Sequence, residues 1–146
     1  MPYRHLKPVE AKTLLDKNEG WSVLDVRTVE EFGQAHVPGA FNVPVVEPDR
    51  SGRMAPNPHF LPAIARQFSK DSRVIVHCAA GVRSMHACEI LSQAGYTQVI
   101  NMQAGFHGAR DPTGRVVEPG WSALGFPVEN AAAPEQTYAG IKKKIV

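Results

Sequence analysis

Hydrophobic residues recur along the chain in two alternating patterns, one typical of helices and one typical of short buried strands. Apolar residues three or four positions apart predict helices over residues 8–15, 60–68 and 85–94. Short apolar runs predict strands over residues 21–26, 40–43, 73–77 and 97–101. Strands that alternate with helices are typical of proteins built on a parallel sheet. The pattern therefore predicts an α/β fold with a mostly parallel sheet.

The stretches between these elements are rich in Gly, Pro and charged residues. We expect exposed loops over residues 45–58 and 107–120. Residues 130–135 are rich in Ala and Pro, and a run of three lysines follows at residues 142–144. The sequence thus predicts one domain over residues 1–129, followed by a linker and a solvated tail over residues 130–146.

The composition is that of a soluble globular protein. It argues against some classes of function but favours none. Of the 146 residues, 43% are hydrophobic and 21% are charged. The net charge of +2, from 16 basic and 14 acidic side chains, is too small to favour binding to nucleic acid or to a membrane surface. Residues 1–17 lack the apolar core of a signal peptide. A cytoplasmic location is therefore expected.

The two cysteines, Cys78 and Cys88, are too few for a disulfide framework or a zinc motif. The six histidines also lack the spacing of metal ligands, so no metal is expected. Cys88 occupies an apolar position of the helix predicted over residues 85–94. We expect it in the core, with a role as a resolving thiol for Cys78 as the alternative.

The strand over residues 73–77 leads directly into Cys78, which is the candidate nucleophile. The residues that follow it are Ala79, Ala80, Gly81, Val82, Arg83 and Ser84. Backbone N–H groups at a helix N-terminus stabilise a thiolate, and the amides of this loop can converge on the sulfur if Gly81 takes a positive φ. We therefore expect Cys78 to be catalytic and residues 79–84 to bind the substrate. The alternative is a buried structural cysteine.

The polar side chains of the loop have more than one interpretation. Arg83 faces the mouth of the site and attracts an anion, or it forms an internal ion pair with Asp25 that holds the loop in shape. Ser84 is expected to be the N-cap of the following helix, with a catalytic hydroxyl as the alternative.

A second helix start is predicted upstream. Thr28 and Glu31 have the spacing of a capping box, in which each side chain bonds the backbone N–H of the other residue. Arg27 precedes this turn, and we expect it to form an ion pair with Glu31. These residues are expected to support the scaffold, with substrate contact by Arg27 and Asp25 as the alternative.

Three motifs occur in order along the chain. The first is an aspartate-containing strand and a His-Pro-Gly-Ala-like segment, which read Leu24-Asp25-Val26-Arg27 and His36-Val37-Pro38-Gly39-Ala40. The second is Cys-x-x-Gly-x-Arg-Ser at residues 78–84, and the third is an Ala-Gly-Tyr turn at residues 94–96. With these motifs the chain resembles the single-domain rhodaneses, the rhodanese-like sulfurtransferases, from Tyr3 to Val128. It departs from them in the turn at residues 102–106, in an insertion around residues 110–115 and in the tail.

This resemblance implies a three-layer rhodanese-like domain, in which helices flank a mostly parallel five-stranded sheet. It implies that Cys78 takes a sulfane sulfur from thiosulfate or a related donor, carries it as a persulfide, and passes it on. The implied partners are a small-molecule sulfur donor and a thiol or cyanide acceptor, with a thioredoxin-like protein as one candidate acceptor. No cofactor is implied.

Two other classes of function stay open. The first is a rhodanese-like binding or redox-sensor module that does not turn over substrate. The second is a phosphatase or arsenate reductase. Related dual-specificity phosphatases have one residue more between cysteine and arginine, and their wider ring fits a phosphate. The shorter spacing from Cys78 to Arg83 favours a single sulfur atom.

Overall fold

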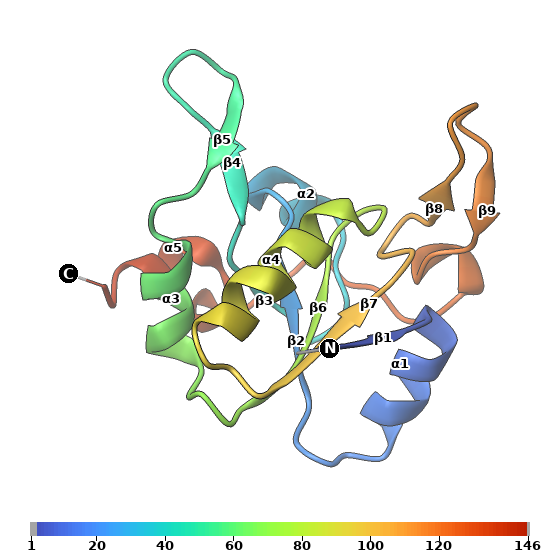
Figure 1. Ribbon diagram of the computed structural model, residues 1–146, viewed down its shortest axis with the longest axis horizontal. Helices are drawn as coiled ribbons and strands as arrows, with labels where there is room; N and C mark the ends of the chain where they lie inside the picture. Colours follow the sequence, from blue (N-terminus) through green and yellow to red (C-terminus); the bar gives the residue numbers. More distant parts are fainter. Residues whose placement is uncertain (1–2, 146) are drawn as a thin grey trace.

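The computed structural model describes residues 3–145 and contains one central sheet of five strands. In space the strands follow the order β1-β7-β6-β2-β3 (Figure 1). Their bounds are β1 Arg4–Leu6, β2 Ser22–Asp25, β3 Phe41–Asn42, β6 Arg73–His77 and β7 Gln98–Met102. All neighbouring strands are parallel, which confirms the predicted α/β fold.

Helices cover both faces of this sheet. They are α1 Pro8–Asp16, α2 Val29–Gln34, α3 Phe60–Gln67, α4 Val82–Gln93 and α5 Tyr138–Lys142, with short 3₁₀ turns η1 Ser122–Leu124 and η2 Pro134–Gln136. Successive residues of a strand point to opposite faces. On β6, Val74 and Val76 therefore join the core beneath α3, α4 and α5, whereas Ile75 joins the core beneath α1 and α2. The result is the expected three-layer domain.

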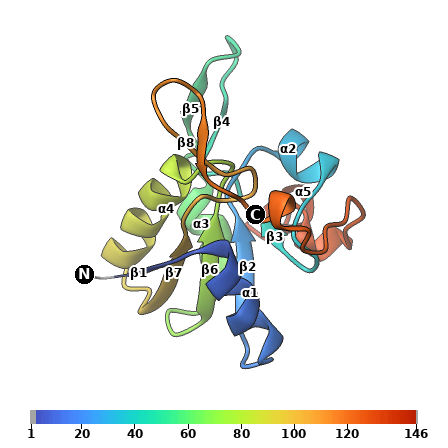
Figure 2. The same cartoon turned by 90° about the vertical axis from the view of Figure 1, so that its right-hand side faces the viewer.

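Both stretches that were expected to be loops form hairpins. The first consists of β4 Val46–Pro48 and β5 Met54–Pro56, and the second of β8 Ala109–Arg110 and β9 Val116–Glu118. They follow β3 and β7, so both leave the sheet at the carboxyl ends of its strands. Figures 1 and 2 show them rising from the same end of the domain.

One strand and one helix start differ from what the sequence predicted. Strand β1 was not predicted, because Arg-His-Leu has no apolar pattern; it forms by pairing with the edge of β7. Helix α4 begins at Val82 rather than at residue 85, because Gly81 takes a φ of 109° and ends the loop there. The second difference changes the role of the residues beside Cys78.

Residues 130–145 were expected to be a linker and a solvated tail, and most of this segment instead packs on the domain. Tyr138 and Ile141 of α5 are buried in the core beneath α3. The Asn57 side-chain amide donates to the Tyr138 hydroxyl at 3.1 Å, which ties the segment to the start of α3. The lysine run at residues 142–144 is exposed, as expected. Within residues 3–145, no helix is long and apolar enough to cross a membrane.

Candidate active site

Cys78 lies directly after β6, at the carboxyl end of the central strand. Cys78 is only 1% exposed, and its Sγ accepts a hydrogen bond from the Gly81 N–H at 3.1 Å. Gly81 is the N-cap residue of α4 and has the positive φ that the sequence suggested. The sulfur therefore lies against the N-terminus of a twelve-residue helix, where the aligned peptide dipoles favour negative charge.

A second segment holds this loop from outside. The N–H groups of Phe106 and His107 donate to the carbonyls of Cys78 and Ala79, each at 2.8 Å. Between them and β7 the chain turns sharply through Ala104 and Gly105, whose φ values are 65° and 58°. Gly105 passes so close to the loop that a Cβ there would overlap the Cys78 carbonyl oxygen. The turn at residues 104–107 thus acts as a clamp on the cysteine loop.

Ser84 was expected to be the N-cap of the helix, but Gly81 occupies that position instead. Because α4 begins at Val82, Ser84 is its third residue and is fully buried. Its hydroxyl donates to the Gly81 carbonyl at 3.3 Å and lies 3.5 Å from the Cys78 sulfur. The helix start therefore turns the hydroxyl toward the sulfur rather than toward a free backbone N–H.

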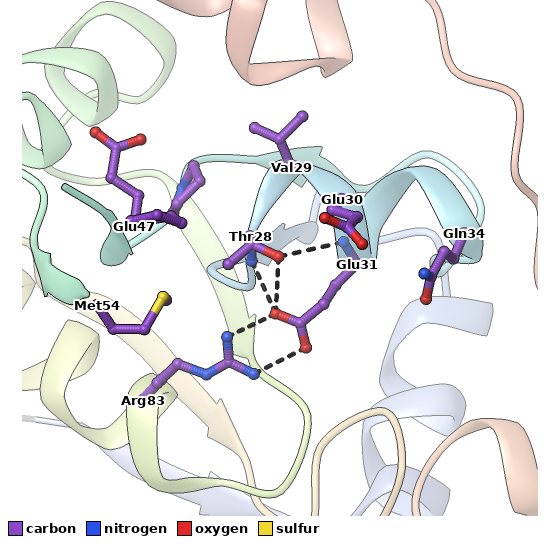
Figure 3. Close-up of a pocket in the computed structure, with 10 residues that line it drawn as sticks. Thr28, Val29, Glu30, Glu31, Gln34, Glu47, Met54 and Arg83 are labelled. Carbon is purple, nitrogen blue, oxygen red and sulfur yellow. Dashed lines mark hydrogen bonds and ion pairs between the residues drawn. The ribbon is translucent and has the colours of Figure 1, made fainter. Parts of the chain in front are cut away.

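Arg83 forms an ion pair, although with a different partner from the expected Asp25. Its two terminal nitrogens donate to the two carboxylate oxygens of Glu31 at 2.7 and 3.0 Å. Glu31 also bonds Thr28, because the predicted capping box at the start of α2 is present (Figure 3). Burial alone would raise the pKa of Glu31, but the hydrogen bonds from Arg83 and Thr28 outweigh it and lower this pKa to about 2.

Asp25 and Arg27 pair with each other, so the expected pair between Arg27 and Glu31 is wrong. Arg27 Nη2 donates to the Asp25 carboxylate at 2.7 Å, and both side chains are buried. Asp25 is the last residue of β2, and only two positions separate it from Arg27, so the local turn brings the pair together. The Arg27 guanidinium lies 4.4 Å from the centre of the Phe106 ring, and this contact supports the clamp.

His77 lies beneath the cysteine loop in the same buried network. Its Nδ1 is 3.1 Å from the Cys78 carbonyl oxygen, and its Nε2 is 3.7 Å from the Asp25 carboxylate. Burial lowers the pKa of His77, and the nearby Asp25 only partly opposes this shift. The imidazole is therefore neutral near pH 7 and orients the loop rather than supplying positive charge.

Cys88 is fully buried on α4, in the core cluster that contains Cys78. Burial, together with the negative charges of Cys78 and Glu89, raises the pKa of this thiol to about 12. Cys88 thus behaves as a protonated core residue, as expected. Among residues 3–145 no group of three or more His, Cys, Asp or Glu side chains could hold a metal ion.

The loop residues divide into buried and exposed positions. Gly81 is buried, Ala79 and Arg83 are partly buried, and Ala80 and Val82 are exposed. Arg83 reaches a groove of about 750 Å³ between α2 and the first hairpin, lined also by Glu30, Glu47 and Met54 (Figure 3). Because Glu31 occupies the guanidinium, this groove offers no free cation.

Comparison with known proteins identifies the family of this fold and loop. A family model described as "Rhodanese-like domain" matches residues 7–111. The chain belongs to the rhodanese-like domain family. The cysteine loop lies inside the matched region, and the second hairpin lies mostly beyond it.

Named relatives of this rhodanese-like domain support a sulfurtransferase family. The chain is 42% identical over 87 residues to thiosulfate sulfurtransferase 16, chloroplastic, of Arabidopsis thaliana, covering 60% of this chain and 72% of the relative. It is 44% identical over 87 residues to protein HIGH ARSENIC CONTENT 1, mitochondrial, of the same plant, covering 60% of this chain and 51% of that protein. The crystal structure of Rv0390 from M. tuberculosis superposes with a TM-score of 0.64 at 25% identity, over 87% of this chain and 97% of that one.

The clamp is the part of the rhodanese-like site that sequence reasoning missed. Residues 102–106 stood out only as a departure from the family turn, whereas the structure makes them the outer support of the loop. The available signal was Gly105, since a glycine after a buried strand often marks a close backbone approach.

Substitution of Gly105 by Ala is expected to loosen the cysteine loop, because the added methyl group would overlap the carbonyls of Cys78 and Ala79. Hydrogen exchange of the Phe106 and His107 amides should become about tenfold faster, the equivalent of ~1.4 kcal/mol of local protection. Gly39→Ala is the matched control, since Gly39 has a φ of 78° but open space around it. Equal exchange rates in both variants would contradict the clamp.

The pair between Glu31 and Arg83 should make stability depend on pH in the acid range. The folded pKa of Glu31 is lowered to about 2, so the contribution of the pair is present above pH 4.5 and is lost as the pH falls toward 2. We expect Glu31→Gln to lower the free energy of unfolding by about 1 kcal/mol at pH 6, and by less near pH 2. Urea denaturation measures this difference. The exposed neighbour Glu30, changed to Gln, should show no such pH-dependent gap.

Proposed function

We propose that this protein is a sulfurtransferase that moves a sulfane sulfur from thiosulfate or a related donor to a thiol or to cyanide through a persulfide on Cys78. One observation carries the proposal: the Cys78 sulfur lies at the N-terminus of α4 and accepts the Gly81 N–H. Membership of the rhodanese-like family and the relative named as a thiosulfate sulfurtransferase support it.

In the first step the Cys78 thiolate attacks the outer sulfur of thiosulfate. The S–S bond of the donor breaks, and sulfite leaves with the bonding electron pair. Cys78 then carries a persulfide whose outer sulfur bears the negative charge, so charge and atoms balance without an oxidant. The thiolate is the nucleophilic form, and the helix dipole together with the Gly81 N–H favours it.

The persulfide needs donors around its outer sulfur, because a buried anion without hydrogen bonds is costly. Residues 79–84 are proposed to supply these donors from the backbone. Ser84 can add its hydroxyl by rotating from the Gly81 carbonyl to the sulfur, which is 3.5 Å away. Arg83 does not serve as a free anion ligand in this proposal, since Glu31 holds its guanidinium, and it braces the loop instead.

In the second step a thiolate or cyanide attacks the outer sulfur. The S–S bond of the persulfide breaks, the sulfur leaves as a new persulfide or as thiocyanate, and the Cys78 thiolate is restored. Two half-reactions through a covalent intermediate predict ping-pong kinetics. No metal or redox cofactor is needed for either step.

Incubation with thiosulfate should add one sulfur atom to the wild-type protein, and intact-protein mass spectrometry should detect it. Cys78→Ser should take up none, because the hydroxyl is not a competent nucleophile at neutral pH. Cys88→Ser is the matched control and should be loaded like the wild type, because Cys88 is buried and protonated.

If neither thiosulfate, 3-mercaptopyruvate nor a small persulfide loads Cys78, the sulfurtransferase proposal fails. A binding or redox-sensor module would then be favoured. Hydrolysis of an aryl phosphate, or reduction of arsenate, that disappears in Cys78→Ser would instead favour the third class of function.

A further inference from the structure

The two hairpins end in the same five-residue turn, although they lie far apart in the sequence. Residues 49–53 read Asp-Arg-Ser-Gly-Arg, and residues 111–115 read Asp-Pro-Thr-Gly-Arg. In the first turn the Asp49 carboxylate accepts from the Ser51 hydroxyl and N–H and from the Arg53 N–H, at 2.6 to 3.1 Å. Asp111 accepts the same three bonds in the second turn, at 2.6 to 3.0 Å. Each tip is therefore a fixed structure rather than a loose loop.

These turns present arginines. Each Asp carboxylate is directed into its own turn, whereas four basic side chains are exposed at or beside the tips: Arg50, Arg53, Arg110 and Arg115. Within residues 3–145 none of the four forms an ion pair. Arg110 also donates to the Gly114 carbonyl at 2.7 Å. With one aspartate against two arginines, each tip carries a net charge of +1.

The topology of the sheet places the cysteine loop between the two hairpins. In the order β7-β6-β2-β3, the second hairpin follows β7, the first follows β3, and Cys78 follows β6. All three leave the sheet at the carboxyl ends of parallel strands. Figure 1 shows one hairpin on each side of the start of α4, and both figures show the tips beyond the loop.

The surface around the loop also carries large apolar side chains that face solvent. Val82 is 79% exposed and Met85 47% exposed at the start of α4. Met54 on β5 is 51% exposed, and it lines the same groove as Arg83. Exposed apolar residues gathered on one surface mark contacts with a partner more often than isolated ones do.

We propose that the two hairpins are docking arms for a protein acceptor that carries acidic side chains around its thiol. The proposal rests on the sulfur transfer proposed above and names the partner class. A folded acceptor can contact both tips while an apolar segment of it reaches the loop, which a small thiol cannot do. Glu30 and Glu47 lie in the groove at the foot of the first arm, so the acidic side chains of the partner are expected at the tips rather than in this groove.

The transfer step itself needs no new reactant. The thiolate of the acceptor attacks the outer sulfur of the Cys78 persulfide, that sulfur moves to the acceptor, and the Cys78 thiolate leaves. The arms act before this step, since complementary charge mainly raises the rate of encounter and is weakened by salt.

Two synthetic peptides of equal length test the proposal, each with one cysteine at the centre and flanked by four Glu or by four Lys residues. The protein is loaded with thiosulfate, and mass spectrometry follows the loss of sulfur from Cys78. At low ionic strength we expect the Glu peptide to accept sulfur about tenfold faster than the Lys peptide, with the difference shrinking in 0.5 M salt. The variant with all four arm arginines changed to Glu should reverse this preference.

Two controls are needed. One tests whether any loss of basic charge has the same effect as changing the arms, and the other tests whether the arm variant still transfers sulfur normally. Four exposed basic residues at the end of α1, on α3 and in the C-terminal segment, changed to Glu together, should leave the preference intact: Lys17, Arg66, Lys143 and Lys144. With 2-mercaptoethanol, which is small and neutral, the arm variant should react at the wild-type rate. Equal rates for both peptides, or the same loss in the control variant, would overturn the proposal.

Binding without sulfur transfer distinguishes a failure of docking from a failure of the proposed chemistry. In Cys78→Ser, the Glu peptide with Ser in place of Cys should shift the amide NMR signals of Gly52 and Gly114 at the tips. If these signals shift while the wild-type Cys78 takes up no sulfur from any donor, the hairpin tips bind an acidic peptide but the sulfurtransferase proposal is wrong. If a single-stranded oligonucleotide shifts them at lower concentration than the Glu peptide, the arms are a nucleic-acid site and the protein-acceptor proposal is wrong.

Discussion

The close passage of Gly105 against the cysteine loop is the contact on which the site depends. It lets the N–H groups of Phe106 and His107 bond the carbonyls of Cys78 and Ala79. Once these carbonyls are held from outside, the Gly81 N–H is directed inward, toward the sulfur. A residue with a side chain at position 105 could not approach so closely, and the loop would lose its outer support.

The charged side chains near the loop form ion pairs with one another, so the hydrogen bond to the Cys78 sulfur comes from the backbone. Arg83 is bound by Glu31 and Arg27 by Asp25, so both arginines near the loop have carboxylate partners. The neutral His77 adds no charge beneath the loop. The Gly81 N–H and the dipole of α4 are therefore the features that favour negative charge at Cys78. Free positive charge lies farther out, on the hairpin tips.

The sequence predicted those features of the structure that depend on residues close together in the chain. The alternation of strands and helices, the capping box of Thr28 and Glu31, and the position of Cys78 between a strand and a helix are all confirmed. What could not be predicted depends on partners distant in sequence. Arg83 meets Glu31 across 52 positions, and β1 exists only because β7 offers an edge. The tail has just two buried apolar side chains on α5, too few to produce a helical pattern, so its packing was missed.

We propose that the clamped loop holds an anionic sulfur on Cys78 with backbone N–H groups. A crystal structure of the protein after reaction with thiosulfate tests it most directly. We expect an additional sulfur atom bonded to Cys78 Sγ, within about 3.5 Å of backbone nitrogens between residues 80 and 84, with the Arg83–Glu31 pair intact. A sulfur atom directed away from these amides, or one bound by a freed Arg83 guanidinium, would contradict it.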